Sequence, residues 1–294
     1  MPMIDTIETI ETTIRYIRNR RCRDGGYCFY RLNEPNVADT YYALTSLQML
    51  NALPEDDRKT ISFLHTFQNQ DGGFSNVYVG YRAITSLIIL GERPQRDPTG
   101  WILSSLRPPS DDIRPIESSS CFFQAYLLTD LCRYLTIPIT GNIRETIINT
   151  ILRNVHHEGG FGSPSATLAD TSYALSILEN LGYHDTSTRS RLFIHRCEDP
   201  EFGFLAMPGM YPPYLEDIHA GLCASSLLGE RPAFLRSCEV FIMKCFHENG
   251  GYVRSVFGGS ATLEHTYHAL DAMRMITIIR NEHAKRRSDT GSVV

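Results

Sequence analysis

The chain has 294 residues, of which 42% are hydrophobic and 21% charged, a composition that is typical of a folded globular protein and excludes a disordered one. A formal net charge of −5 argues against the basic surface that nucleic-acid binding requires, so we expect no nucleic-acid partner. No apolar run is long enough to form a transmembrane segment, and the eight cysteines form no C-x-x-C pair. We therefore expect reduced thiols and a cytoplasmic location.

The first twenty residues combine acidic and arginine side chains with regularly spaced isoleucines, which predicts an amphipathic helix rather than a signal peptide. This helix begins the first copy of a unit of roughly 45 residues, a period typical of helical repeat arrays. Each copy has a polar helix, a Gly-Gly-aromatic turn, a polar loop and a more apolar helix. The turn recurs at 24–27, 71–74, 158–161 and 249–252, with a weaker version at 201–204.

The apolar helices of the units share one pattern. They align around 39–44, 81–87, 170–175, 217–222 and 265–270, and the third copy, which lacks the glycine turn, keeps 108–112 before a helix near 121–125. The glycine pairs tolerate the left-handed conformation that ends a helix, and we expect Asp39 and Asp170 to cap the starts of their helices. The units therefore number six.

The two helices of each unit differ in polarity, which predicts where each one lies. The second helices are apolar on most faces, as a surrounded helix requires, whereas the first helices carry the polar stripe of an outer layer. We therefore predict an all-α fold, an α6–α6 (alpha/alpha toroid) barrel of six helical-hairpin repeats over residues 1–275. Residues 276–294 are expected to form a C-terminal tail that is partly disordered. The aligned starts of the inner helices make one mouth mildly positive.

Residues 68–74, Gln-Asn-Gln-Asp-Gly-Gly-Phe, resemble a specific family element. This Q-x-x-D-G-G-aromatic element is shared by protein prenyltransferase β subunits and squalene-hopene-type terpenoid cyclases, and the resemblance covers nearly the whole chain. Those proteins form α6–α6 barrels, so the resemblance implies the fold that the repeats predict.

The resemblance also implies a metal site. Prenyltransferases hold their metal with an Asp-x-Cys pair in one late repeat and a His in the next; here Asp217, His219 and His265 match those positions, with His in place of Cys. Three such ligands leave a zinc ion with an open fourth position, as in catalytic sites, and the set also suits non-haem Fe(II). In the structural alternative, Asp217 caps a helix and both histidines are satisfied core groups.

The chain differs from the family at the residues with which the family binds diphosphate. The family's Arg, Lys and His correspond here to Tyr211, Tyr214 and Thr167. Both tyrosines are candidate catalytic hydroxyl donors or aromatic walls for a cation, or they are packing residues. Arg82 and Arg254 are candidates for replacing the anion contacts, or they are rim charges.

Further candidates lie on the inner helices. His268 is either a catalytic proton shuttle or a core histidine. Aromatic residues of the inner helices are expected to line an apolar substrate pocket, or else to form core: Tyr41, Tyr81, Phe122, Phe123, Tyr173 and Tyr267.

Three functional hypotheses follow. The first is a zinc-dependent enzyme acting on a hydrophobic, isoprenoid-like substrate as a prenyl transferase or a metal-assisted cyclase; a protonation-initiated cyclase is disfavoured because no D-x-D-D or D-C-T motif occurs. The second is a non-catalytic, β-type subunit that needs a helical partner chain or forms a homodimer. The third is a non-haem iron oxygenase or lyase on the same barrel.

Overall fold

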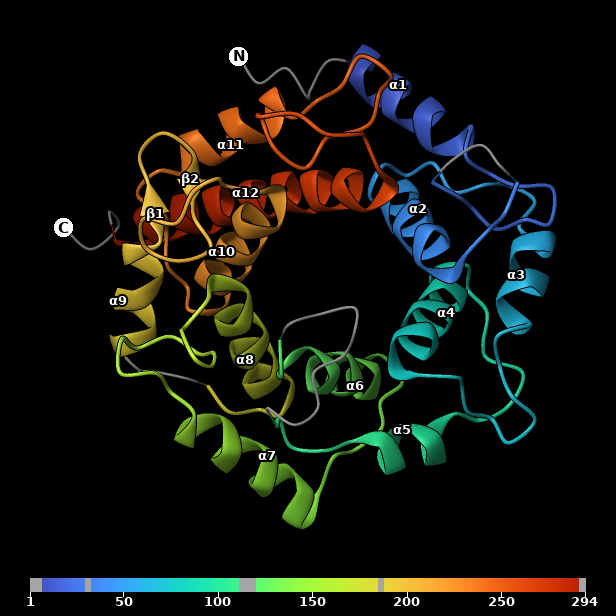
Figure 1. Cartoon of the computed structure of the whole chain (residues 1–294), viewed down its shortest axis with the longest axis horizontal. Helices are drawn as coiled ribbons and strands as arrows, with labels where there is room; N and C mark the ends of the chain where they lie inside the picture. Colours follow the sequence, from blue (N-terminus) through green and yellow to red (C-terminus); the bar gives the residue numbers. More distant parts are fainter. Residues whose placement is uncertain (1–6, 30–32, 111–119, 185–187, 291–294) are drawn as a thin grey trace.

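The computed structural model describes residues 7–29, 33–110, 120–184 and 188–290, and in those ranges twelve helices alternate between an outer and an inner layer (Figure 1). The outer helices are α1 (Ile7–Arg18), α3 (Arg58–His65), α5 (Thr99–Ser105), α7 (Gly141–Arg153), α9 (Thr188–Arg196) and α11 (Leu235–Lys244). The inner helices are α2 (Val37–Met49), α4 (Val77–Ile89), α6 (Phe123–Tyr134), α8 (Leu168–Asn180), α10 (Leu215–Leu227) and α12 (Leu263–Thr290).

The inner helices form a closed ring. Each packs against the next in chain order, and α12 packs against α2, which joins the last repeat to the first. Figure 1 shows the outer helices around this ring, so the predicted barrel of six hairpins is confirmed. The strands β1 (Glu198–Asp199) and β2 (Gly203–Phe204) form a small antiparallel pair at the fifth turn.

The glycine turns join neighbouring repeats. Gly25, Gly72, Gly159 and Gly250 all have φ between +86° and +100°, a region that glycine occupies without strain. They also touch the following repeat: a methyl group on Gly25 would lie 2.3 Å from the Lys59 carbonyl carbon at the start of α3. A methyl group on Gly250 would lie 2.5 Å from the Thr12 carbonyl oxygen in α1, so the last turn closes the ring on the first helix.

The expected helix caps lie three residues earlier than predicted. Asn36 and Thr167 are the N-cap residues of α2 and α8, and their side chains accept hydrogen bonds from the amides of Asp39 and Asp170. The prediction that these aspartates are themselves N-caps was wrong. Asp39 instead accepts a hydrogen bond from the Phe29 amide, 2.9 Å away, and so ties the loop to the helix.

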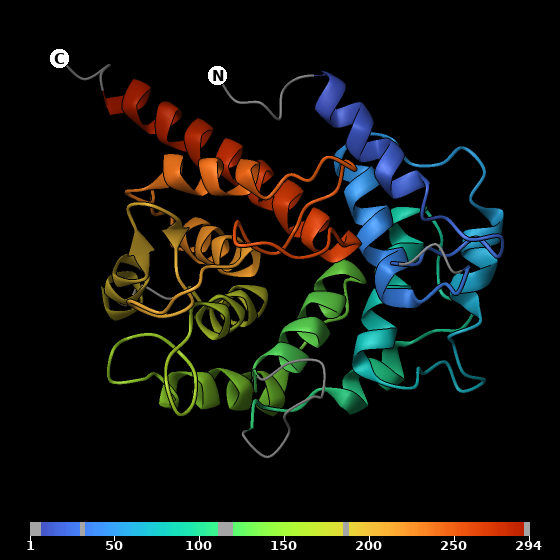
Figure 2. The same ribbon diagram turned by 45° about the horizontal axis from the view of Figure 1, so that its top comes forward.

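The C-terminal segment continues the last inner helix without a break at residue 275. Ile276 and Ile279 are buried, and Arg280 forms an ion pair with the buried Glu239 of α11 at 2.9 Å. Figure 2 shows α12 extending past the ring toward the end of the chain. Residues 291–294, the last of the predicted tail, lie outside the described residues, as do positions 111 and 112 of the third repeat's turn. Among the described helices, none has the length and apolarity that a bilayer crossing needs.

Replacing Gly250 with alanine tests the ring closure. Both Gly250→Ala and the control Gly91→Ala place a side chain at positive φ, but Gly91 has no neighbouring atom within 4 Å. We expect Gly91→Ala to lower the free energy of unfolding by about 1 kcal/mol. Gly250→Ala should cost about 1–3 kcal/mol more, because the new methyl group overlaps backbone atoms of α1. Urea denaturation measures both; equal losses would show that the Gly250 contact does not stabilise the ring.

Candidate active site in the barrel

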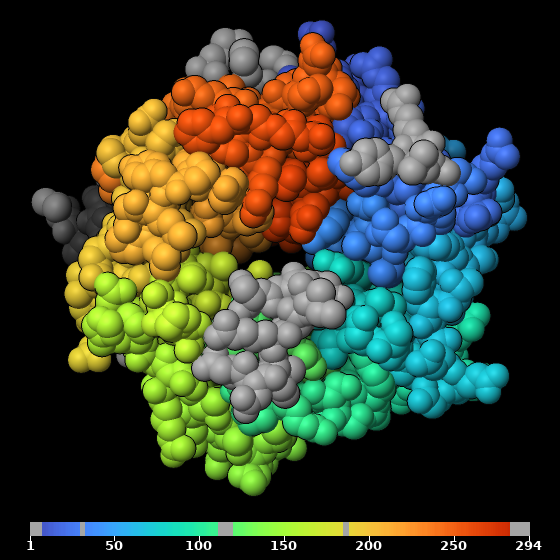
Figure 3. Space-filling model, in the orientation of Figure 1, coloured from blue at the N-terminus to red at the C-terminus, as the bar shows by residue number. Residues whose placement is uncertain are grey.

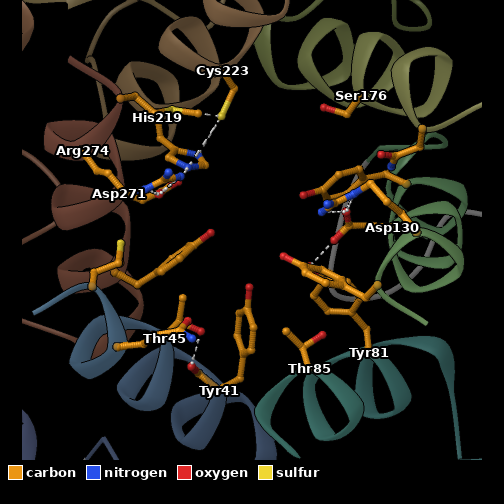
Figure 4. Close-up of a pocket in the computed structure, with 18 of the residues that line it drawn as sticks. Tyr41, Thr45, Tyr81, Thr85, Asp130, Ser176, His219, Cys223, Asp271 and Arg274 are labelled. Carbon is orange, nitrogen blue, oxygen red and sulfur yellow. Dashed lines mark hydrogen bonds and ion pairs between the residues drawn. The ribbon is translucent and has the colours of Figure 1, made fainter. Parts of the chain in front are cut away.

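The inner helices enclose two chambers that share part of their walls. The larger, of about 770 Å³, lies toward the C-terminal ends of the inner helices, and the smaller, of about 220 Å³, lies toward their N-terminal ends. We call them the C-terminal chamber and the N-terminal chamber. Figure 3 shows the molecule hollowed at the centre of the ring, and Figure 4 shows side chains from all sides directed into this space.

The wall repeats with the helix period, because residues at i, i+4 and i+7 lie on one face of a helix. Each inner helix contributes one residue to a first layer of the wall, which we call the tyrosine layer: Tyr41, Tyr81, Tyr126, Ser172, His219 and Tyr267. Four residues later comes the polar layer: Thr45, Thr85, Asp130, Ser176, Cys223 and Asp271. Three residues further comes the mouth layer: Gln48, Ile88, Arg133, Glu179, Ser226 and Arg274. The expected apolar pocket is therefore aromatic at its centre and polar toward one mouth.

Aromatic rings contact one another around the tyrosine layer. Ring centroids are 5.8 Å apart between Tyr41 and Tyr81, and 5.9 Å apart between Tyr41 and Tyr267, in edge-on or tilted geometry. On the opposite wall, Tyr126 stacks on Tyr173 at 5.2 Å. Burial raises the pKa of Tyr41 to about 12, so its hydroxyl stays protonated at neutral pH. The layer therefore offers neutral rings and hydroxyl groups to a ligand.

A hydrogen bond from α4 reaches an ion pair within α6. The Tyr81 hydroxyl donates a hydrogen bond of 2.8 Å to Oδ2 of Asp130, and Arg133 donates to Oδ1 of the same carboxylate through Nε and Nη2. Asp130 is buried, whereas half of the Arg133 side chain is exposed. The carboxylate is thus covered while the guanidinium extends toward the mouth.

An ion pair joins α10 and α12, and its residues occupy the same layers of the wall as Tyr81, Asp130 and Arg133. His219 Nε2 lies 2.7 Å from Oδ2 of Asp271, and Arg274 donates to Oδ1 through Nε and Nη2. Burial raises the pKa of Asp271, but its bonds to His219 and Arg274 outweigh burial and hold the pKa well below its usual value. In Figure 4 this group faces Tyr81 and Asp130 across the cavity. The two halves of the barrel therefore carry equivalent aspartate–arginine pairs.

The predicted metal ligands do not converge. Asp217 is buried at the third position of α10, where Oδ2 accepts a hydrogen bond of 3.0 Å from the Tyr214 amide and caps the helix. His219 points into the cavity toward Asp271, and His265 is half-buried with Nδ1 unpaired. Within the described ranges, no three His, Cys, Asp or Glu side chains are placed to hold a metal ion. In this arrangement the predicted set does not fit zinc or Fe(II).

The other predicted residues separate into two groups. Tyr41, Tyr81 and Tyr267 line both chambers, and the N-terminal chamber is also lined by Arg82, Phe123, Tyr173 and His268. Outside both cavity walls lie Phe122, Tyr211, Tyr214 and Arg254.

Specific contacts hold the residues of the second group away from the cavity. Phe122 is buried against Phe161, at a centroid distance of 6.1 Å. Tyr211 is exposed and donates a hydrogen bond to Asp199. Arg254 lies over the Tyr214 ring and pairs with Glu216 at 2.7 Å.

Several wall residues were absent from the sequence prediction. Tyr126, Asp130, Arg133, Asp271 and Arg274 all line the C-terminal chamber. The available signal was a D-x-x-R spacing on the third and sixth inner helices, one turn beyond an aromatic residue. In the third repeat this spacing could not be recognised from the sequence, because the repeat lacks the glycine turn by which α6 would be aligned with the other inner helices.

A closed ring of six helical hairpins around a tyrosine-walled cavity defines an α/α toroid protein. The sequence model of the prenyltransferase alpha-alpha toroid domain matches residues 3–163 and 99–292, and the chain belongs to that family. No curated protein sequence matches the chain.

Solved structures share the fold at low identity. One is Candida albicans protein geranylgeranyltransferase-I complexed with GGPP, with a TM-score of 0.65, 15% identity and 90% of each chain covered. Another is a type II terpene cyclase from Scytonema with geranylgeranyl dihydroxybenzoate, with a TM-score of 0.60, 11% identity, and 92% of this chain and 97% of that chain covered. A protein from Actinoplanes has a TM-score of 0.56 and 14% identity, with 92% of this chain and 99% of that chain covered.

The variant Asp217→Asn distinguishes a helix cap from a metal ligand. Burial raises the pKa of Asp217 to about 7, above its ordinary value of 3.8. The folded chain therefore keeps a proton that the unfolded chain loses, so stability should fall as pH rises from about 4 to about 7. Asparagine still accepts from the Tyr214 amide without that titration, and at pH 8 it should gain stability on the order of 2–4 kcal/mol in urea denaturation.

Metal content of the same variant completes the test, with Asp39→Asn as the control at the equivalent position of α2. We expect substoichiometric zinc and iron, unchanged by either substitution, in plasma mass spectrometry. Stoichiometric metal that is lost in Asp217→Asn and retained in Asp39→Asn would instead establish Asp217 as a ligand.

Proposed function

We propose that this protein is an enzyme that takes an isoprenoid-like substrate into the barrel and stabilises a cationic intermediate against the tyrosine layer. The observation that carries the proposal is the set of tyrosine rings that line the two chambers: Tyr41, Tyr81, Tyr126, Tyr173 and Tyr267. Aromatic faces attract a cation that has been removed from water. The combined chambers also have the size of cavities that bury small-molecule ligands.

Family membership and the structural neighbours support this proposal. The family is described as a prenyltransferase toroid, and two neighbours were solved with GGPP or geranylgeranyl dihydroxybenzoate. Both ligands carry an isoprenoid chain.

His268 is positioned to accept a proton from such an intermediate. It lines the N-terminal chamber, its Nδ1 is unpaired, and its ring lies 5.0 Å from that of His219. Burial and the neighbouring His219 lower the pKa of His268 well below its usual value, so the imidazole is neutral and can act as a base. Departure of a leaving group carried by the substrate, together with its bonding electron pair, would form the cation. Transfer of a proton from that cation to His268 would then leave a neutral alkene and a protonated imidazole.

The N-terminal mouth favours a cyclase over a diphosphate-dependent transferase. Arg254 is paired with Glu216, and Arg82 lies beside the Tyr42 hydroxyl, which itself donates to Glu264. These carboxylates offset the arginines that would otherwise hold a diphosphate. Zinc or Fe(II) at Asp217, His219 and His265 is the expectation from the sequence that the metal analysis of Asp217→Asn tests, and no step proposed here depends on a metal.

Ring-removing and ring-retaining variants of Tyr267 test the proposal. We expect the protein to bind farnesol or geranylgeraniol and to convert an isoprenoid substrate to a product detectable by gas chromatography and mass spectrometry. Because a desolvated cation–π contact contributes about 1–2 kcal/mol, Tyr267→Leu should slow conversion about 5- to 30-fold, while Tyr267→Phe should stay close to wild type. If no isoprenoid alcohol, acid or diphosphate binds, the proposal fails.

A subunit that needs a partner is a second candidate, favoured by an exposed aromatic patch. Tyr211 and Phe257 are more than half exposed, and both rings lie about 6 Å from that of Phe202. Such a patch is typical of interaction surfaces. Light scattering should then give a mass above the 33.3 kDa of one chain, reduced to that mass in Phe257→Ser. A monomer that is active without any partner would contradict this candidate.

A further inference from the structure

The polar layer does not suit a hydrocarbon chain. Every inner helix places a polar or sulfur-containing side chain at this level: Thr45, Thr85, Asp130, Ser176, Cys223 and Asp271. Thr85 is 6% exposed, and its hydroxyl oxygen has no hydrogen-bond partner among the described residues. An unpaired buried hydroxyl is costly unless a ligand satisfies it. The layer therefore marks the position of a polar group of the substrate.

The two ion pairs present hydrogen-bond donors rather than acceptors to the chamber. Both oxygens of Asp130 are engaged, by Tyr81 and by Arg133, and both oxygens of Asp271 are engaged, by His219 and by Arg274. Each arginine forms its ion pair through Nε and Nη2, so its Nη1 amino group takes no part in the pair. The Arg133 and Arg274 side chains are 53% and 52% exposed, whereas those of their aspartates are 7% and 10% exposed. The accessible groups of these two ion pairs are therefore guanidinium donors.

The charge balance limits the kind of acceptor. Each arginine is already neutralised by its own aspartate, and Glu179 of the mouth layer, paired with His184, adds a further carboxylate. A diphosphate, with several negative charges, would meet no net positive field here. A carboxylate carries one charge and matches the planar fork of a guanidinium. The donors and the charge together favour a carboxylate.

We propose that the C-terminal chamber binds the carboxylate head of an isoprenoid acid, with Arg133 or Arg274 as its donor and the tail directed into the tyrosine layer. This inference rests on the proposed function and adds the class and the orientation of the substrate. The head group would lie at the mouth opposite the Arg82 and Arg254 rim.

Three ligands that share one isoprenoid tail but differ in their head group test the inference. Binding of farnesoic acid, farnesol and farnesyl diphosphate is measured by calorimetry for wild type, for Arg133→Gln/Arg274→Gln and for the control Arg82→Gln in the N-terminal chamber. We expect farnesoate to bind more tightly than farnesol, and the double variant to lose about 10- to 100-fold for farnesoate alone, the usual range for a charged hydrogen bond. Arg82→Gln should leave the preference for farnesoate over farnesol unchanged.

A charge-balanced variant controls for misfolding, because removing an arginine takes an ion-pair partner from its buried aspartate. The variant that combines Asp130→Asn, Arg133→Gln, Asp271→Asn and Arg274→Gln removes two negative and two positive charges, so the net charge of the chamber is unchanged. It should still bind farnesol while losing the preference for farnesoate. The inference is overturned if farnesoate binds no better than farnesol, if the diphosphate binds best, or if Arg82→Gln causes the loss.

A separate measurement distinguishes failure of this inference from failure of the proposed function. Octanoate has the head but no isoprenoid tail, and it should shift the NMR signals of the Arg133 and Arg274 Nε–H groups, assigned from the single Arg→Gln variants. If no isoprenoid binds but octanoate still shifts these signals, the function fails and the carboxylate site stands. If octanoate shifts neither signal, the carboxylate site is overturned.

Discussion

The contact between a glycine turn and the next outer helix is the constraint on which the barrel depends. It recurs around the ring and ends where Gly250 lies against Thr12 of α1. A helical repeat cannot bury its apolar face alone, so each hairpin needs a neighbour on both sides. Closure supplies that neighbour to the first and last repeats, and it removes the exposed ends that an open solenoid would have to cap.

Closure also explains why the centre of the molecule can be polar. The residues that pack between the two layers are small or aliphatic and almost fully buried, such as Ala43, Leu44 and Leu47 of α2. The positions that face the centre line the cavity, and so they are free of that packing demand. They carry tyrosines, hydroxyl groups and ion pairs instead. Core and cavity wall therefore separate on opposite faces of the same helices, and the wall can change its chemistry while the fold stays constant.

The same register explains which sequence predictions succeeded. The repeat number, the two layers and the cavity position of Tyr41, Tyr81 and Tyr267 follow from the turns and from the helix period. Asp217 appeared distinctive beside His219, yet it occupies the third helical position, as Asp39 and Asp170 do, and its carboxylate accepts a hydrogen bond from the Tyr214 amide at the start of its helix. A pattern transferred from relatives predicts a metal ligand at Asp217, a position where the local register also provides a helix cap.

What the sequence could not provide was the pairing across helices. Asp130 and Asp271 are unremarkable in isolation, and only the assembled ring brings each beside the tyrosine-layer residue of the preceding helix, Tyr81 or His219. The two pairs occupy the same register three repeats apart, so they differ mainly in that donor. A tyrosine hydroxyl stays neutral at physiological pH, whereas histidine can carry a charge. A cavity with near-twofold walls thereby gains two chemically different sides, and that difference can give one orientation to a bound ligand.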